Sequence, residues 1–173
     1  METMRCFICI DIPNDIKEKL AKAASRIEGS VSIVNKEMMH ITLAFLGNIT
    51  EEEEKKAEQA IIGLSVKPFY ISVHGIKAFE AGSRQIVFAG IEEGSKELAE
   101  LSNEIRSRLD EKGIGYDKKA FVSHITLARV YGKYSITDAN EDFGRFLCNE
   151  IKIKKSVLSN KGATHYDLFL ARL

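Results

Sequence analysis

The pentapeptide HITLA occurs twice in this chain, in MMHITLAFLG (residues 38–47) and in VSHITLARVYG (residues 122–132). The two copies begin 84 residues apart, at His40 and His124. Among unrelated residues such a match has odds on the order of one in a few hundred, whereas a duplicated structural unit produces it directly. We therefore expect two related halves that face each other across a shared cleft.

Each copy is predicted to be a buried strand, in which successive side chains point to opposite faces. His40 and Thr42 then share one polar face, while their apolar neighbours seat the strand on the helices. The second copy repeats this arrangement with His124 and Thr126. The small residues expected to continue the two polar faces are Ala44 and Ala128.

The rest of the chain alternates between helical and strand patterns. Periodicity, capping residues and glycine stops predict helices over about residues 14–27, 51–63, 95–112 and 137–147, and strands over about residues 5–11, 31–34, 38–46, 68–80, 84–91, 121–130, 149–158 and 164–172. The fold class is predicted to be α+β, with two pseudo-symmetric lobes, antiparallel sheets lining a central cleft and helices outside. Residues 1–173 are expected to form a single bilobal domain, because no change of composition marks a boundary.

The charge balance argues against recruitment of a ligand by net charge. Lys and Arg number 25, as do Asp and Glu, so an anionic ligand has to be held by local groups. Apolar residues make up 45% of the chain, which indicates a folded domain. The apolar run near the N-terminus is too short for a signal sequence or a membrane span. We therefore expect a cytoplasmic protein without membrane association, and we expect a monomer.

The three cysteines are predicted to be core thiols in a reducing compartment. Cys6 and Cys9 have the C-x-x-C spacing, but residues three apart in a strand point to opposite faces. A redox or metal pair is therefore not expected at this position, and burial in the core is.

Two imidazoles that converge on one cleft, each with a hydroxyl two residues further along, suit phosphoryl chemistry. With an unperturbed pKa of about 6.5, one histidine can act as a base while the other, protonated, acts as an acid. Threonine hydroxyls can donate hydrogen bonds to the nonbridging oxygens of a phosphate. A metal site is the less favoured alternative, because neither copy contains a carboxylate ligand. The plainest alternative is a pair of structural strands whose histidines face solvent.

Together with the opening RCFICIDIP, the segments HITLAFLG and SHITLARV resemble the two-histidine (2H) phosphoesterase superfamily. Within it they are similar to the RNA 2′,3′-cyclic phosphodiesterases, also called 2′-5′ RNA ligases, over nearly the whole chain from Arg5 onward. The resemblance implies hydrolysis of RNA 2′,3′-cyclic phosphate ends, tRNA fragments among them, to 2′-phosphates. It implies no metal and no other cofactor, and it allows the reverse reaction, 2′-5′ ligation.

The resemblance also implies a role for each motif residue. His40 would be the general acid that protonates the departing ribose 3′ oxygen, and His124 the general base that activates water. The residues expected to hold the phosphate are Thr42, Thr126 and Arg129, and the residue expected to stack on or border the terminal base is Phe45.

Arg129 and Phe45 each lie five residues after a repeat histidine. In an ideal strand, residues an odd number apart point to opposite faces. A bulge or a strand end is therefore required to turn either side chain toward the cleft. Without one, Phe45 is a core residue.

Other functions remain open at this point. An RNA-end or nucleotide binding module would keep the cleft with little turnover, and a phosphodiesterase for small cyclic-phosphate nucleotides would use the same chemistry. Lys118 and Lys119 either line an RNA groove or are solvated. The lysines expected to protect an edge strand are Lys152, Lys154 and Lys155, and the histidines expected to be ordinary surface or hydrogen-bonded residues are His74 and His165.

Overall fold

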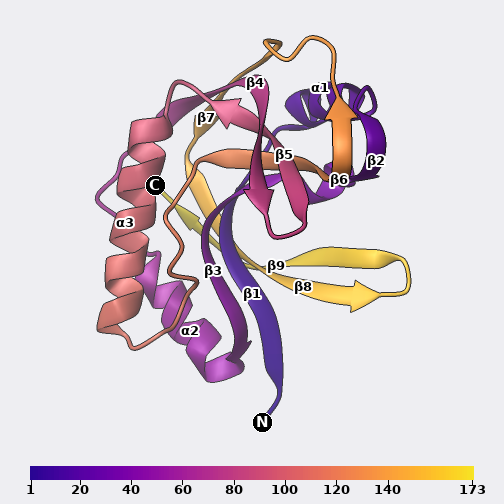
Figure 1. The fold of residues 1–173 in the computed structure, drawn as a ribbon. Helices are drawn as coiled ribbons and strands as arrows, with labels where there is room; N and C mark the ends of the chain where they lie inside the picture. Colours follow the sequence, from indigo (N-terminus) through magenta and orange to yellow (C-terminus); the bar gives the residue numbers. More distant parts are fainter.

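Two antiparallel β-sheets with helices outside them make up this computed structural model, which describes residues 1–173 (Figure 1). The elements in chain order are β1 (Thr3–Asp11), α1 (Asn14–Ala24), β2 (Glu28–Ile33), a single 3₁₀ turn (Lys36–Met38), β3 (His40–Thr50), α2 (Glu51–Ala60), β4 (Phe69–Ala81), β5 (Arg84–Ile91), α3 (Ser95–Glu111), β6 (His124–Ser135), β7 (Asp142–Cys148), β8 (Glu150–Ser159) and β9 (Gly162–Arg172). The predicted fold class, α+β with two lobes, is confirmed.

The two sheets have matching strand orders. The first sheet runs β3-β1-β8-β9, and the second contains the series β6-β5-β4-β7 with β2 added beyond β6. Each HITLA strand, β3 or β6, thus begins its series and pairs with β1 or β5, respectively. This equivalence is the pseudo-symmetry that the repeat predicts.

The lobes differ from the two halves of the chain, because helices cross from one sheet to the other. Helix α3 follows β5 of the second sheet but packs behind β3 of the first, where the Ser102 hydroxyl donates to the Leu43 carbonyl at 2.8 Å. Helix α1 follows β1 but packs against β6 and β7. One core cluster of 38 buried residues draws on both sheets.

The helix predicted over residues 137–147 is wrong. The segment forms a turn followed by β7, in which the side chains of Phe143 and Cys148 are buried. Asp138 caps no helix and adopts a left-handed backbone conformation (φ 58°) in the preceding turn. The open edge of β4 provides the backbone partners, from Phe69 opposite Cys148 onward, so pairing with the sheet overrides the local capping signal.

Thr50 and Glu53 form a capping box at the start of α2, the helix that the sequence predicts from residue 51. The Thr50 hydroxyl accepts from the Glu53 N–H at 3.2 Å, and the Glu53 carboxylate accepts from the Thr50 N–H at 2.8 Å. These bonds satisfy two of the free N–H groups at the start of α2.

The cysteines are buried and unpaired, as predicted. Burial raises the pKa of the Cys6 thiol to about 11 and that of Cys9 to about 12, so neither is a reactive thiolate near neutral pH. None of the helices is both long and apolar enough to cross a bilayer.

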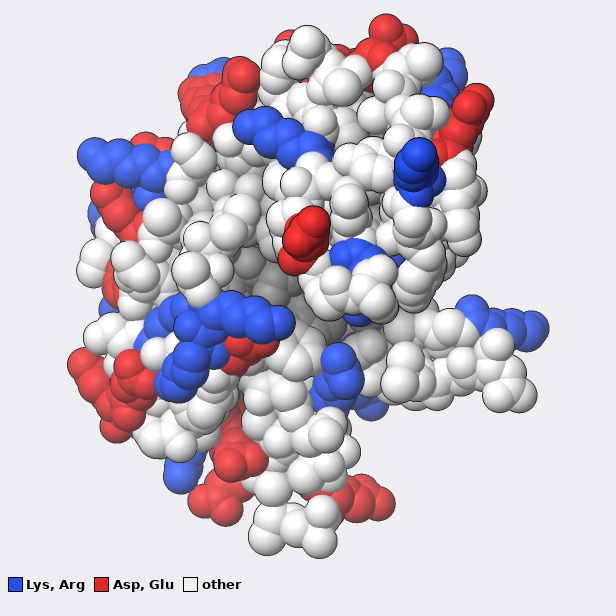
Figure 2. Space-filling view, in the orientation of Figure 1, with Lys and Arg blue, Asp and Glu red and all other residues white.

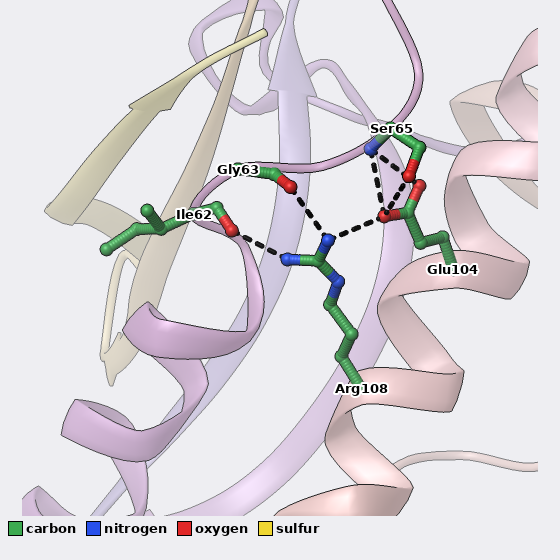
Figure 3. Close-up of polar contacts among 5 residues, drawn as sticks. All are labelled: Ile62, Gly63, Ser65, Glu104 and Arg108. Carbon is green, nitrogen blue, oxygen red and sulfur yellow. Dashed lines mark hydrogen bonds and ion pairs between the residues drawn. The ribbon is translucent and has the colours of Figure 1, made fainter.

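The loop from α2 to β4 is held by two side chains of α3 (Figure 3). The Arg108 guanidinium donates to the carbonyls of Ile62 and Gly63 at 2.6 and 2.7 Å, and to the Glu104 carboxylate at 2.8 Å. Glu104 in turn accepts from the Ser65 N–H at 2.9 Å. Charge-assisted bonds to backbone groups of this kind are stronger than neutral ones.

Replacing Arg108 with alanine is expected to lower the free energy of unfolding by about 2 kcal/mol, because two loop carbonyls and Glu104 lose their donor. Urea unfolding of the wild type and the variant measures the change. Arg172→Ala is the matched control, since its ion pair with Glu150 spans 3.6 Å with Arg172 72% exposed and is expected to contribute less than about 0.5 kcal/mol. Equal losses in the two variants would contradict a special role for the loop contacts.

Candidate active site

A cleft of about 690 Å³ lies between the two sheets, and both HITLA strands line it. Its walls also include residues of β1, of the segment around the 3₁₀ turn and of the β8–β9 hairpin. The cleft brings together every residue that the sequence predicts for the site, namely His40, Thr42, Phe45, His124, Thr126 and Arg129.

Strand β3 contains a β-bulge directly after its H-x-T segment. Cys9 of β1 pairs with Thr42, whereas the preceding residue, Ile8, pairs with Ala44. Leu43 is therefore the extra residue on β3, and from this point the alternation of side chains is reversed.

Strand β6 has its bulge at the equivalent position. Phe88 of β5 pairs with Thr126, whereas Val87 pairs with Ala128. Leu127 is the extra residue here, so the repeat carries the same bulge in both copies.

The bulges explain how side chains five residues after each histidine reach the cleft. Phe45 and Arg129 both line it, as the resemblance implies. The expectation that Ala44 and Ala128 continue the polar face is wrong, because the reversed alternation buries both alanines at 1% exposure or less. The two alanines therefore pack in the core and do not border the space above the imidazoles.

The His40 ring is held at both nitrogens. Its Nδ1–H donates to the Met38 carbonyl at 2.7 Å, which leaves Nε2 to accept from the Thr42 hydroxyl at 2.8 Å. This assignment follows because a carbonyl can only accept. Burial lowers the pKa of His40 to about 4, and the nearby His165 and Lys154 contribute in the same direction.

The His124 ring has the same orientation as His40. Its Nδ1 lies 2.5 Å from the Val122 carbonyl, two residues before it, so Nδ1 again carries the proton and Nε2 is the free nitrogen. The rings of Phe79 and Phe88 lie edge-on at 5.6 and 5.5 Å between centroids. In both repeat histidines Nε2 is therefore the nitrogen without a proton.

The lining of the cleft is basic although the chain is neutral. It includes Arg5, Arg129 and Lys161 besides histidines, and it contains no aspartate or glutamate. Since the chain has 25 acidic residues, their exclusion from this surface favours an anionic ligand.

His165 lies in the cleft, contrary to the expectation of an ordinary histidine. It extends from β9 next to His40, and burial lowers its pKa, with Lys154 adding to the effect. Its single copy and its position near a strand start carried no sequence signal. His74 is ordinary, as predicted, since its Nδ1 lies 3.1 Å from the Glu92 carboxylate outside the cleft.

The predicted edge-strand role of the β8 lysines is wrong, because β8 lies between β1 and β9. Lys152 and Lys154 are largely buried, and each lies within 3.4 Å of both Asp11 and Asp167. The two lysines hold the pKa of Asp11 below its usual value despite burial. Asp11 pairs with His40 in the sheet, so this network supports the strand segment that carries the histidine.

Lys118 and Lys119 do not line the cleft. Lys118 lies over the Tyr116 ring at 3.5 Å and near the Asp110 carboxylate at 3.6 Å. No group of three or more His, Cys, Asp or Glu side chains is arranged to hold a metal ion.

A family model described as the AKAP7 2′5′ RNA ligase-like domain matches residues 7–169. The chain therefore belongs to this family, which confirms the resemblance indicated by its repeat.

Curated relatives align over almost the full length of the chain. The RNA 2′,3′-cyclic phosphodiesterase of Archaeoglobus fulgidus is 33% identical over 95% of this chain and 98% of its own length. The protein of the same name from Methanocaldococcus jannaschii is 34% identical over 92% of this chain and 95% of its own. The crystal structure of E. coli LigT complexed with 3′-AMP has a TM-score of 0.88 over 99% of both chains at 23% identity, a likeness of fold.

Proposed function

We propose that this protein hydrolyses the 2′,3′-cyclic phosphate ends of RNA to 2′-phosphates by acid and base catalysis with two histidines and no metal. The observation that carries the proposal is the matched pair of H-x-T strands, whose imidazoles both present Nε2 in one basic cleft. Relatives that align over nearly the whole chain are named for this activity.

In the proposed reaction, His124 and His40 move the two protons. Nε2 of His124 takes a proton from water as the water oxygen attacks phosphorus. The bond from phosphorus to the 3′ oxygen breaks, and Nε2–H of His40 gives its proton to that oxygen. The phosphate stays on the 2′ oxygen. The Nδ1 hydrogen bonds to Met38 and Val122 fix both rings for these transfers.

For His40 to act as an acid it has to gain a proton when the substrate enters, since its pKa is about 4 in the free protein. The negative phosphate favours the charged ring. Protonation at Nε2 also ends the hydrogen bond that this atom accepts from Thr42. The Thr42 hydroxyl is then free to donate to a phosphate oxygen, so charging the acid and binding the phosphate are coupled.

Thr126 and Arg129 are proposed to complete the phosphate site, because the bulge on β6 brings both to the cleft. Phe45 is proposed to stack on the terminal base. Arg5 lies 5.0 Å from the centroid of its ring, and both side chains line the same cleft.

The proposed substrates are single-stranded RNA ends, tRNA fragments among them, and the reverse reaction would join such an end to a 5′-hydroxyl in a 2′-5′ linkage. All the proposed catalytic residues come from one chain, which supports action as a monomer. The unpaired cysteines support a reducing location such as the cytoplasm.

The test is an incubation of the purified protein with a short RNA that ends in a 2′,3′-cyclic phosphate, in excess EDTA. We expect a product with a 2′-phosphate, identified by mass and by removal of the phosphate with phosphatase. Activity only after addition of zinc or manganese would contradict the metal-free mechanism. Tight binding of the RNA end without turnover would identify a binding module, and turnover of nucleoside cyclic phosphates alone would identify a small-nucleotide enzyme.

A further inference from the structure

A row of three polar side chains crosses the first sheet beside His40. Arg5 on β1 pairs with Ser156 on β8, and Ser156 pairs with His165 on β9. Residues directly opposite in antiparallel strands point to the same face, and all three line the cleft. The His165 ring lies 5.5 Å from the His40 ring, centroid to centroid. We call these three residues the Arg5 row.

The Arg5 row is a set of free hydrogen-bond donors. Its side chains make none of the ion pairs or side-chain hydrogen bonds that hold other polar residues, such as the bidentate contact of Arg145 with Glu93 at 2.7 and 2.9 Å. The row also faces a cleft without carboxylates. A guanidinium, a hydroxyl and an imidazole N–H side by side match the oxygens of a phosphate.

The wall continues beyond the row. Strands β8 and β9 project past the body of the protein as a hairpin (Figure 1), and its turn carries Lys161, which also lines the cleft. Figure 2 shows basic atoms at the end of this projection. Gly162 and Ala163 bring little bulk to the cleft side, so a strand of nucleic acid has room along the hairpin.

We propose that the Arg5 row is a second phosphate subsite, which binds the phosphate on the 5′ oxygen of the terminal nucleoside. The inference rests on the proposed function, in which the cyclic phosphate lies between His40 and His124. A single ribose separates the cyclic phosphate from the 5′ oxygen, a span comparable with the 5.5 Å between the rings of His40 and His165. In an RNA strand this phosphate is the diester to the preceding nucleotide.

The kinetic test compares three substrates: adenosine 2′,3′-cyclic phosphate, the same nucleoside with a 5′-phosphate, and a dinucleotide that ends in the same cyclic phosphate. The 5′-phosphate is expected to raise kcat/KM about tenfold, mainly through KM, because it gains charge-assisted contacts. An equal or larger gain with the dinucleotide identifies an RNA diester as the natural ligand. A gain confined to the 5′-phosphorylated nucleoside identifies free nucleotides. A gain in kcat/KM confined to the dinucleotide shows that the cleft contacts the preceding nucleoside, and this result overturns the phosphate subsite.

Arg5→Gln and His165→Gln are expected to reduce the gain from the 5′-phosphate to about twofold or less. The quantity compared is the ratio of kcat/KM with and without the 5′-phosphate, which cancels any effect on the cyclic phosphate itself. Arg84→Gln is the matched control, since Arg84 lines a separate surface at the start of β5, and it is expected to keep the wild-type ratio. An unchanged ratio in both row variants would overturn the proposal.

A binding measurement separates this inference from the proposed function. Isothermal titration calorimetry compares adenosine 2′,5′-bisphosphate with adenosine 2′-monophosphate, neither of which requires turnover. About tenfold tighter binding of the bisphosphate, lost in Arg5→Gln, supports the subsite even if no cyclic phosphate is hydrolysed. Equal affinities for the two ligands would overturn the subsite even if hydrolysis is confirmed.

Discussion

Replacing His124 with alanine is expected to lower kcat on an RNA 2′,3′-cyclic phosphate by about 10³-fold, and His40→Ala by a similar factor. Each variant removes a group that transfers a proton in the transition state, a contribution of about 10² to 10⁴ in rate. Both rings are held at Nδ1 by a carbonyl two residues earlier, so Nε2 is the nitrogen of each ring that can transfer a proton. Steady-state kinetics under EDTA measure the loss.

The matched control for these variants is His74→Ala, because His74 belongs to the ion pair with Glu92 outside the cleft. It is expected to keep kcat within about twofold. If the protein is a binding module, the wild type has a negligible kcat, and the His40 and His124 variants keep their ligand affinity. More than a tenth of the wild-type kcat in His124→Ala would contradict its role as the base.

Proton uptake by His40 on substrate binding is the second expected result. Its pKa is about 4 in the free protein, so the ring is neutral at pH 6. A phosphate bound beside Thr42 favours the charged ring and raises this pKa. Binding at pH 6 is therefore expected to draw about half a proton or more from the buffer.

The measurement uses adenosine 2′,3′-cyclic phosphate with the His124→Ala variant, in which His40 is intact and turnover is suppressed. The cyclic diester does not titrate near pH 6, so the uptake, measured by calorimetry in buffers of different ionisation enthalpy, reports on the protein. The double variant with His40→Gln is expected to show no uptake. If the single variant shows none either, His40 stays neutral in the complex, and the roles of acid and base have to be exchanged.

Much of the fold could be predicted because its patterns are local. The helices that begin near Asn14, at Glu51 and at Ser95 follow from periodicity and capping residues, and most strands from apolar runs. The segment 137–147 could not, because its capping signal is local while the edge of β4 that captures it is distant in sequence. The crossing of α1 and α3 between sheets also depends on long-range packing.

The sequence by itself determined the duplicated H-x-T strands, the family and the six residues that meet in the cleft. An exact repeat that contains histidine and threonine can be recognised without any structural information. Only the tertiary structure decided how these residues are arranged in the cleft. The bulges at Leu43 and Leu127 exist through pairing with β1 and β5, and they turn Phe45 and Arg129 into the cleft. The neutral state of His40 and the arrival of His165 beside it depend on burial and on a neighbouring strand more than 100 residues away in the chain, which no local pattern encodes.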